Sequence, residues 1–234
     1  MTDTRAGNPV ARASTLGKIY DASPDPVVAL DGVSLQVHAG EFLAVCGPSG
    51  CGKSTLLLTI GLLLRPDAGK LEIAGQNIAE LSRSRQISFR AQNIGFVFQD
   101  FHLIPYLNVL ENVMVPTLAE PLCNVQDRGE MLLEEMGLTA RRDHLPSELS
   151  AGERQRTALV RALMLRPRLI LADEPTGNLD RDNTDCVLNH LANYTKSGGA
   201  VVLATHDERA MMCAERRVFM DKGRIVGSGE VNKR

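Results

Sequence analysis

A nine-residue motif between two apolar runs constrains the fold of this 234-residue chain more than any other feature. It reads Gly47-Pro48-Ser49-Gly50-Cys51-Gly52-Lys53-Ser54-Thr55, which matches the phosphate-binding pattern G-x-x-x-x-G-K-[ST]. The apolar residues 42–46 before it predict a buried strand, and residues 56–60 after it predict a helix. This order of strand, loop and helix predicts an α/β fold that holds phosphate groups.

The residue types of this loop suit anion binding. Its glycines let successive N–H groups point inward, and the following helix adds the positive end of its dipole. Lys53 adds a full charge near the outer phosphates, and the Ser54 hydroxyl can ligate Mg²⁺. The competing interpretation, a glycine-rich turn that ends in Lys-Ser, is disfavoured by the strand and helix on either side. The motif predicts a nucleoside triphosphate, but it does not distinguish kinases, GTPases and transport ATPases.

Composition excludes several other classes of protein. The 26 Lys and Arg nearly balance the 28 Asp and Glu, and aromatic residues are only 4% with no Trp, so we expect no nucleic acid partner. The five cysteines form no C-x-x-C pair, which argues against a zinc site or a disulfide framework and fits a reducing, cytosolic setting. We interpret Cys51 as a small tolerated side chain rather than a redox sensor.

No signal peptide is expected, and the longest apolar run, residues 56–64, is about half the ~20 residues of a membrane span.

The pattern along the chain predicts how the domain is organised. Residues 1–14 are predicted to be a disordered tail, and residues 15–232 to form one domain. Short strands are predicted at 16–20, 27–30, 33–37, 42–46, 69–75, 94–98, 168–172 and 200–204, with a break at Asp31-Gly32. The last two lack alternation, as in parallel sheets covered on both faces. Residues 101–166 carry helical spacing. We therefore predict an α/β core with a mainly parallel sheet, an antiparallel β subdomain near the N-terminus and an inserted helical subdomain.

Two further motifs carry chemistry. An apolar strand ends in Asp173-Glu174. Beside a phosphate loop, such an aspartate holds magnesium and the adjacent glutamate can polarise the attacking water; a solvated acidic turn is the alternative. Ser150 lies three residues before Glu153 at the start of a helical run, which predicts a capping box. A helix start of this kind is also compatible with a second anion site.

These motifs together resemble ABC ATPases. The segment Leu149-Ser150-Ala151-Gly152-Glu153-Arg154-Gln155-Arg156 resembles their signature motif. Gln99, the Gly177–Asp180 segment, His206 and an aromatic residue upstream, Tyr20, stand where that family places its other motifs. The resemblance covers residues 15–230. It implies a P-loop NTPase (RecA-like) core at 15–98 and 167–232, and a helical subdomain with the signature at 99–166.

A narrower resemblance comes from the segments around Gln99 and Asp173. Residues 98–105, the later Glu111-Asn112-Val113 and residues 173–180 look like the ATPases of lipoprotein-release, macrolide-export and cell-division transporters. In that group the ATPase works with a separate membrane permease. This implies a peripheral subunit on the cytoplasmic face of the inner membrane, with a second copy of the ATPase as its other partner.

The resemblance also implies a role for each residue. Residues 47–55 hold the phosphates of ATP, Tyr20 stacks on adenine, and Ser54, Gln99 and Asp173 organise Mg²⁺. Glu174 is the implied general base, and His206 contacts the γ-phosphate. Ser150 and Gly152 contact the ATP of the opposite copy, and Asp180 links the two sites. Two positions depart from the common signature: Ala151 replaces a glycine and Glu153 replaces a glutamine. We expect Glu153 to cap the helix or point aside.

Two other functions are compatible with an ABC-like sequence. One is a soluble ABC ATPase that acts on DNA or ribosomes; the missing coiled-coil insertion, second fused copy and basic stripe argue against it. The other is a scaffold that binds ATP without hydrolysing it, and Glu174 and His206 argue against that. The sequence leaves open the cargo, the direction of transport and the identity of the membrane partner.

Overall fold

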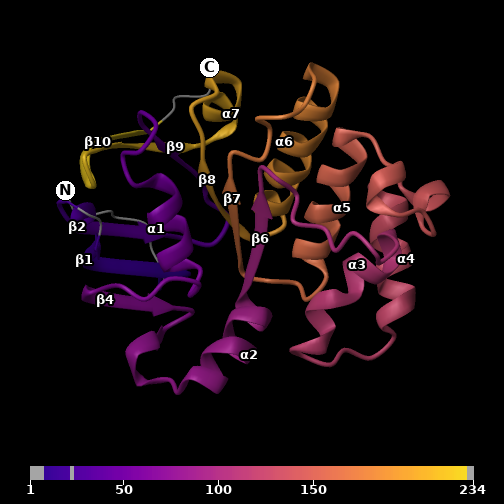
Figure 1. Ribbon diagram of the computed structural model, residues 1–234, viewed down its shortest axis with the longest axis horizontal. Coiled ribbons are helices and arrows are strands. Elements are labelled where there is room, and N and C mark those ends of the chain that lie inside the picture. The colour runs from indigo at the N-terminus through magenta and orange to yellow at the C-terminus, as the bar shows by residue number, and fades with distance from the viewer. Residues whose placement is uncertain (1–7, 22–23, 231–234) are drawn as a thin grey trace.

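Two β-sheets organise the protein in the computed structural model, which describes residues 8–21 and 24–230 (Figure 1). The first is a four-stranded antiparallel sheet in the order β2-β1-β4-β5. Its strands are β1 (Ala11–Tyr20), β2 (Val27–Val37), β4 (Ala68–Ile73) and β5 (Gln76–Asn77). The second sheet has six strands in the order β10-β9-β3-β8-β7-β6. They are β3 (Phe42–Cys46), β6 (Ile94–Phe98), β7 (Leu169–Asp173), β8 (Ala200–Ala204), β9 (Arg216–Asp221) and β10 (Arg224–Glu230).

The six-stranded sheet is parallel except at one edge. β3 pairs in parallel with both β8 and β9, and β7 pairs in parallel with β6 and β8. Only the β9–β10 hairpin is antiparallel. The carboxyl ends of β3, β6, β7 and β8 therefore meet at one edge, where α/β proteins bind their ligands.

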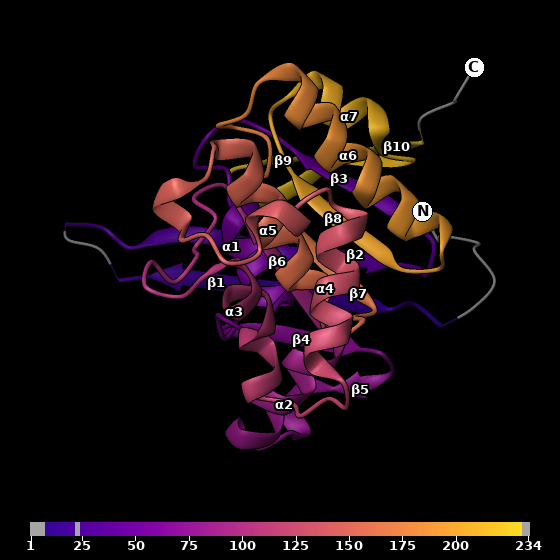
Figure 2. The same cartoon turned by 90° about the vertical axis from the view of Figure 1, so that its right-hand side faces the viewer.

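Helices cover both faces of this sheet, as Figures 1 and 2 show. They are α1 (Lys53–Ile60), α2 (Arg83–Asn93), α3 (Val109–Met114), α4 (Val125–Glu135), α5 (Ala151–Leu163), α6 (Arg181–Lys196) and α7 (Glu208–Cys213). In β3, Leu43 and Val45 pack in a core with α1 and the antiparallel sheet. Phe42, Ala44 and Cys46 pack in a second core with the helices α3 to α7. A strand buried on both faces needs apolar residues without alternation, as the sequence of β3 shows.

These observations confirm the predicted fold class: an α/β fold with a mainly parallel sheet, an antiparallel sheet and a helical segment between β6 and β7. The helices α3, α4 and α5 make up that segment, on the right in Figure 1. The proposed division at residues 98 and 167 stays a prediction. Within the part of the chain that the structure describes, no helix combines the length and the apolar composition of a membrane span.

The predicted disordered tail was wrong for its last residues. β1 begins at Ala11, where Ala11 pairs with Val37 of β2 and with Ile73 of β4. Ala11 and Ala13 are buried. Two short side chains among polar neighbours give a weak strand signal, but they fit closely between two partner strands. Residues 1–7 of the predicted tail lie outside the described residues.

The predicted strand break at Asp31-Gly32 was also wrong. β2 continues from Val27 to Val37 through this dipeptide, and Gly32 adopts a φ of 67°. The pairing with β1 shifts register here, from Leu16 opposite Val33 to Lys18 opposite Leu30. Glycine at positive φ is typical of a β-bulge, which bends a strand without ending it.

Candidate functional site

The phosphate loop requires glycine at two of its positions. Gly47 has a φ of 151°, and a Cβ there would lie 2.3 Å from the carbonyl oxygen of Met220. Gly52 has a φ of 106°, and a Cβ there would lie 2.3 Å from the carbonyl oxygen of Ala29. The loop is thus pressed against β9 and β2. Any side chain at either position would push it out of the shape that exposes its amides.

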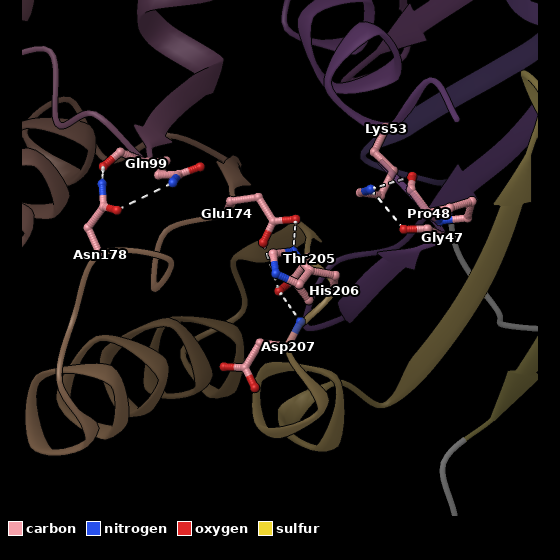
Figure 3. A network of polar contacts seen from close by, with 9 residues as sticks. All are labelled: Gly47, Pro48, Lys53, Gln99, Glu174, Asn178, Thr205, His206 and Asp207. Atoms are coloured by element: carbon pink, nitrogen blue, oxygen red, sulfur yellow. Dashed lines mark hydrogen bonds and ion pairs between the residues drawn. The ribbon is translucent and has the colours of Figure 1, made fainter. Parts of the chain in front are cut away.

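Lys53 places its charge against the first two residues of this loop. Its Nζ donates hydrogen bonds to the carbonyl oxygens of Gly47 at 2.9 Å and Pro48 at 3.0 Å (Figure 3). Lys53 is also the first residue of α1 and is 8% exposed. The ammonium and the positive end of the α1 dipole therefore act at the same place, which suits an anion.

Two other side chains of the motif, Cys51 and Thr55, make different contacts. The Cys51 side chain is buried, and its Sγ packs near Gly47, so the thiol fills space within the loop. Thr55 lies on α1, and its Oγ1 is 3.5 Å from the hydroxyl of Tyr20 at the end of β1. Tyr20 is 38% exposed. An exposed ring beside the phosphate loop is suitably placed to stack on a base.

Asp173 faces the loop from the end of β7. Burial raises the pKa of its carboxyl, and a hydrogen bond with Ser54 works against that rise. Its Oδ1 is buried with no hydrogen-bond partner among the described residues. A buried carboxylate oxygen without a partner is unfavourable unless a cation satisfies it. The Asp173 and Ser54 oxygens are donors of the type that Mg²⁺ takes, so these two residues fit the ion.

Glu174 and His206 form a pair across neighbouring strands (Figure 3). Glu174 Oε1 lies 2.8 Å from His206 Nδ1, and Thr205 Oγ1 donates to Glu174 Oε2 at 3.2 Å. The Glu174 backbone has a φ of 46°, a strained conformation for a non-glycine residue and one that clusters at functional sites. A cavity of about 520 Å³ opens beside them. A fixed carboxylate that faces a cavity is a candidate general base.

Gln99 lies at the end of β6 and contacts another segment of the same edge. Its Nε2 donates to Asn178 Oδ1 at 3.4 Å (Figure 3). Gln155 of α5 joins the two segments, because its Nε2 donates to the carbonyl oxygens of Pro175 at 2.6 Å and Phe98 at 3.3 Å. The structure therefore places Gln99 against the segment after Glu174, while Ser54 pairs with Asp173.

Ser150 caps the N-terminus of α5. Its Oγ accepts from the backbone N–H of Glu153 at 3.2 Å, and Glu153 Oε2 accepts from the backbone N–H of Ser150 at 2.8 Å. This is the predicted capping box. The other oxygen of Glu153 accepts from Arg141 Nε at 2.7 Å. The Arg141 guanidinium and the Ser150 amide lower the pKa of Glu153 to about 2. The expectation that Glu153 caps the helix or points aside agrees with this geometry, in which it caps the helix.

Gly152 and Asp180 both lie against the side chain of Asn183 on α6. A Cβ on Gly152 would lie 2.0 Å from Asn183 Oδ1. Asp180 caps α6 and accepts from the Asn183 backbone N–H at 2.8 Å, which lowers the pKa of Asp180. Arg156 also donates to Asn183 Oδ1, at 2.7 Å. Asn183 thus ties the start of the signature helix to the start of α6.

This arrangement can be compared with known proteins. Residues 30–177 match the family model described as ABC transporter. The chain belongs to the ABC transporter family.

Its similarity to other members of the ABC transporter family spans nearly the whole chain. It is 42% identical to the lipoprotein-releasing system ATP-binding protein LolD of Bordetella pertussis, over 96% of this chain and 99% of that protein. It is 44% identical to LolD of Anaeromyxobacter dehalogenans, over 94% of each. A solved dimeric structure of the ATP-binding cassette MJ0796, bound to ADP and Pi, has a TM-score of 0.88 and 32% identity, over 96% of this chain and 100% of that one.

These findings confirm that the chain is an ABC ATPase of the lipoprotein-release group, which binds and hydrolyses ATP as the ATPase subunit of a transporter. Sequence reasoning missed several residues that support the site. Thr205 carries a hydroxyl directly before His206, and that position was a usable signal. Arg141 gave no local signal, because its partner Glu153 lies twelve positions away. Asn183 follows Asp180 by three residues, as a capping contact requires, but nothing local indicated its contacts with Gly152 and Arg156.

Proposed function

We propose that two copies of this chain close around ATP to drive a separate membrane permease in a lipoprotein-release complex. The observation that carries this proposal is the position of the two halves of the site. The phosphate loop leads into α1 on one face of the six-stranded sheet, and the signature motif begins α5 on the other face. ATP held by one copy needs the Ser150 end of a second copy to be enclosed.

The phosphate loop would hold the nucleotide. The amides of residues 47–55 and the Lys53 ammonium bind the phosphates, and Tyr20 stacks on adenine. The Lys53 contacts inside the loop and the exposure of Tyr20 support these roles. The unpartnered Asp173 oxygen supports a magnesium site at Asp173 and Ser54, with Gln99 as a third contributor. Bound Mg²⁺ would neutralise charge on the phosphate oxygens.

Glu174 would act as the general base. Its carboxylate accepts a proton from the water that attacks the γ-phosphorus. Thr205 and His206 hold this carboxylate by both oxygens. His206 Nδ1 is engaged by Glu174, and its Nε2 remains available to the γ-phosphate. The His206 side chain is 76% exposed, which supports a contact with a ligand.

The second copy would complete the site. Ser150 and Gly152 contact the γ-phosphate of the opposite ATP, and Asp180 relays the state of one site to the other through Asn183. Hydrolysis removes the contact that holds the copies together, so the cycle shifts the population between a closed and an open dimer.

We infer the partner and the cargo from the relatives that the chain matches. The LolD proteins belong to lipoprotein-releasing systems by name, and the chain matches them over nearly its whole length. We assign the same role here: a peripheral subunit at the cytoplasmic face of the inner membrane that powers lipoprotein release. The balance of 26 basic and 28 acidic residues supports the absence of a nucleic acid partner.

The test uses Glu174→Gln, which keeps the size of the side chain but removes the base. We expect turnover to fall by about 10²–10⁴-fold and a dimer that depends on Mg²⁺ and ATP to accumulate in sedimentation velocity. Lys53→Ala is the matched control, because it removes nucleotide binding and should prevent the dimer. Unchanged turnover in Glu174→Gln would refute the assigned base. Release of a labelled lipoprotein from vesicles that contain the co-purified permease tests the cargo.

A further inference from the structure

The Glu153 carboxylate joins the signature serine to an arginine twelve positions upstream of Glu153. One oxygen accepts the Ser150 N–H at 2.8 Å, and the other accepts Arg141 Nε at 2.7 Å. Arg141 ends a single 3₁₀ turn, Thr139–Arg141, that precedes α5. The contacts form a chain from Arg141 through Glu153 to Ser150.

These contacts determine which hydrogen bonds the Ser150 hydroxyl can make. Ser150 Oγ accepts from the Glu153 N–H at 3.2 Å. A hydroxyl that already accepts one hydrogen bond still has its own proton to donate. The capping box therefore leaves the Ser150 proton for an outside acceptor, and a phosphate oxygen is such an acceptor. The position of Glu153 is thus coupled to the orientation of the serine donor.

The same carboxylate would also repel the phosphates of a bound nucleotide. With a pKa of about 2, Glu153 stays ionised at neutral pH. It lies one helical turn from Ser150, where the phosphates of the opposite copy are proposed to bind, and like charges this close repel. The Arg141 guanidinium contributes a compensating charge and holds the carboxylate to one side of the helix start.

Stability alone is a poor explanation for this ion pair. The Arg141 side chain is 43% exposed and that of Glu153 is 18% exposed. Solvent access to the pair reduces what the ion pair contributes to folding. The capping box also does not need the charge, because glutamine serves equally well at this position.

We propose that Arg141 is a positioning residue of the composite nucleotide site: it holds Glu153 so that Ser150 donates to the γ-phosphate and the acid does not repel it. This inference rests on the proposed ATP dimer. The positive charge of Arg141 compensates the negative charge of Glu153. A signature motif that contains an acidic residue can then bind the phosphates of ATP.

The test measures dimer formation with Mg²⁺-ATP in the Glu174→Gln background, by sedimentation at two salt concentrations. Arg141→Ala should weaken the dimer by about tenfold or more, because two such sites occur per dimer and each gains an uncompensated negative charge. The loss should shrink at high salt, which screens partly exposed charges. In the presence of Glu153→Gln, Arg141→Ala should have little further effect.

Arg142→Ala is the matched control. Arg142 is the adjacent arginine and pairs with Glu130 at 3.0 Å, so its removal also breaks an ion pair but leaves Glu153 in place. It should not weaken the dimer. If Arg141 acted on the dimer only by keeping the subunit folded, the dimer lost in Arg141→Ala would not recover at different salt and would not be restored by Glu153→Gln. That result, or equal dimerisation of Arg141→Ala and its parent, would overturn the inference. A parent that forms no ATP dimer would instead refute the proposed function, and this inference with it.

Discussion

Glu174 and His206 are joined by a contact of 2.8 Å between Oε1 and Nδ1, although the residues stand at the ends of different strands. The parallel pairing of β7 with β8 produces this contact, because it brings Asp173 opposite Ala204. Glu174 is held from the backbone as well, where its N–H donates to Ala204 O at 2.9 Å. The carboxylate is therefore fixed before any substrate binds, as electrostatic preorganisation requires.

His206→Ala should reduce turnover more than it reduces nucleotide affinity. The substitution removes one of the two contacts of the Glu174 carboxylate and the proposed contact to the γ-phosphate. We expect kcat to fall by about 10–100-fold. This loss is smaller than the one expected for Glu174→Gln, which removes the base itself. Steady-state kinetics with Mg²⁺-ATP, together with binding of a fluorescent nucleotide, would separate the two quantities. A change in KM alone would contradict the assignment.

Asp173→Asn should stabilise the nucleotide-free protein while abolishing its Mg²⁺-dependent turnover. Burial raises the pKa of Asp173, so the charged form is less favourable in the folded than in the unfolded protein at neutral pH. A neutral amide removes that penalty and also the proposed metal ligand. Urea unfolding at neutral pH should show a higher midpoint. The control is Asp185→Asn, which neutralises an exposed carboxylate on α6 and should change neither quantity.

Gly152→Ala should destabilise the protein even though alanine favours helices. The new Cβ would meet Asn183 Oδ1 at 2.0 Å, and Asp180 and Arg156 hold that side chain in place. We expect a loss of about 1–3 kcal/mol in the free energy of unfolding, as for other overpacked sites. If the clash is the cause, the cost of Gly152→Ala should fall when Asn183→Ala is also present. An equal cost in both backgrounds would point to a different origin.

The sequence predicted the central strands and the local parts of the site well. β3, β6 and β8 carry uninterrupted apolar runs, and their bounds agree with the predicted ones. The capping box at Ser150 was predictable because its partner lies three residues away. By contrast, β1 begins earlier than predicted because Ala11 and Ala13 give a weak hydrophobic signal, although the close approach of β2 and β4 buries them.

Contacts between distant segments could not be predicted from the chain pattern. Gln99 and Asn178 are 79 positions apart, and nothing in their neighbours indicates a pair. Glu153 was recognised as a departure from the usual signature, but its partner Arg141 was not. An arginine on a surface turn has no periodicity to reveal its partner, so only the fold identifies the pair.

Arg161→Met should destabilise the segment that follows Gln99. Arg161 on α5 donates to the carbonyl oxygens of Phe101, at 2.7 Å, and His102. Phe101 and His102 both have positive φ values, of 60° and 48°, so this segment needs external support. Without the charged donor we expect a loss of about 1.5–3 kcal/mol in the free energy of unfolding. The matched control is Arg154→Met on the same helix, which loses only the contact of its guanidinium with the Phe101 ring and should cost about 0.5–1 kcal/mol.

Stability in acid should report the state of Glu153. Its pKa is lowered from 4.5 to about 2, and the Arg141 hydrogen bond is the largest cause. A lowered folded pKa means that the ionised form is favoured by folding, so this contribution is complete above the unfolded value of 4.5 and is lost as the pH falls towards about 2. The difference in unfolding free energy between wild type and Glu153→Gln should therefore change in that window and be constant above it. Arg141→Ala should narrow this pH range, because it raises the folded pKa of Glu153 towards the unfolded value. A difference that does not vary with pH would show that the Glu153 charge gains nothing from Arg141.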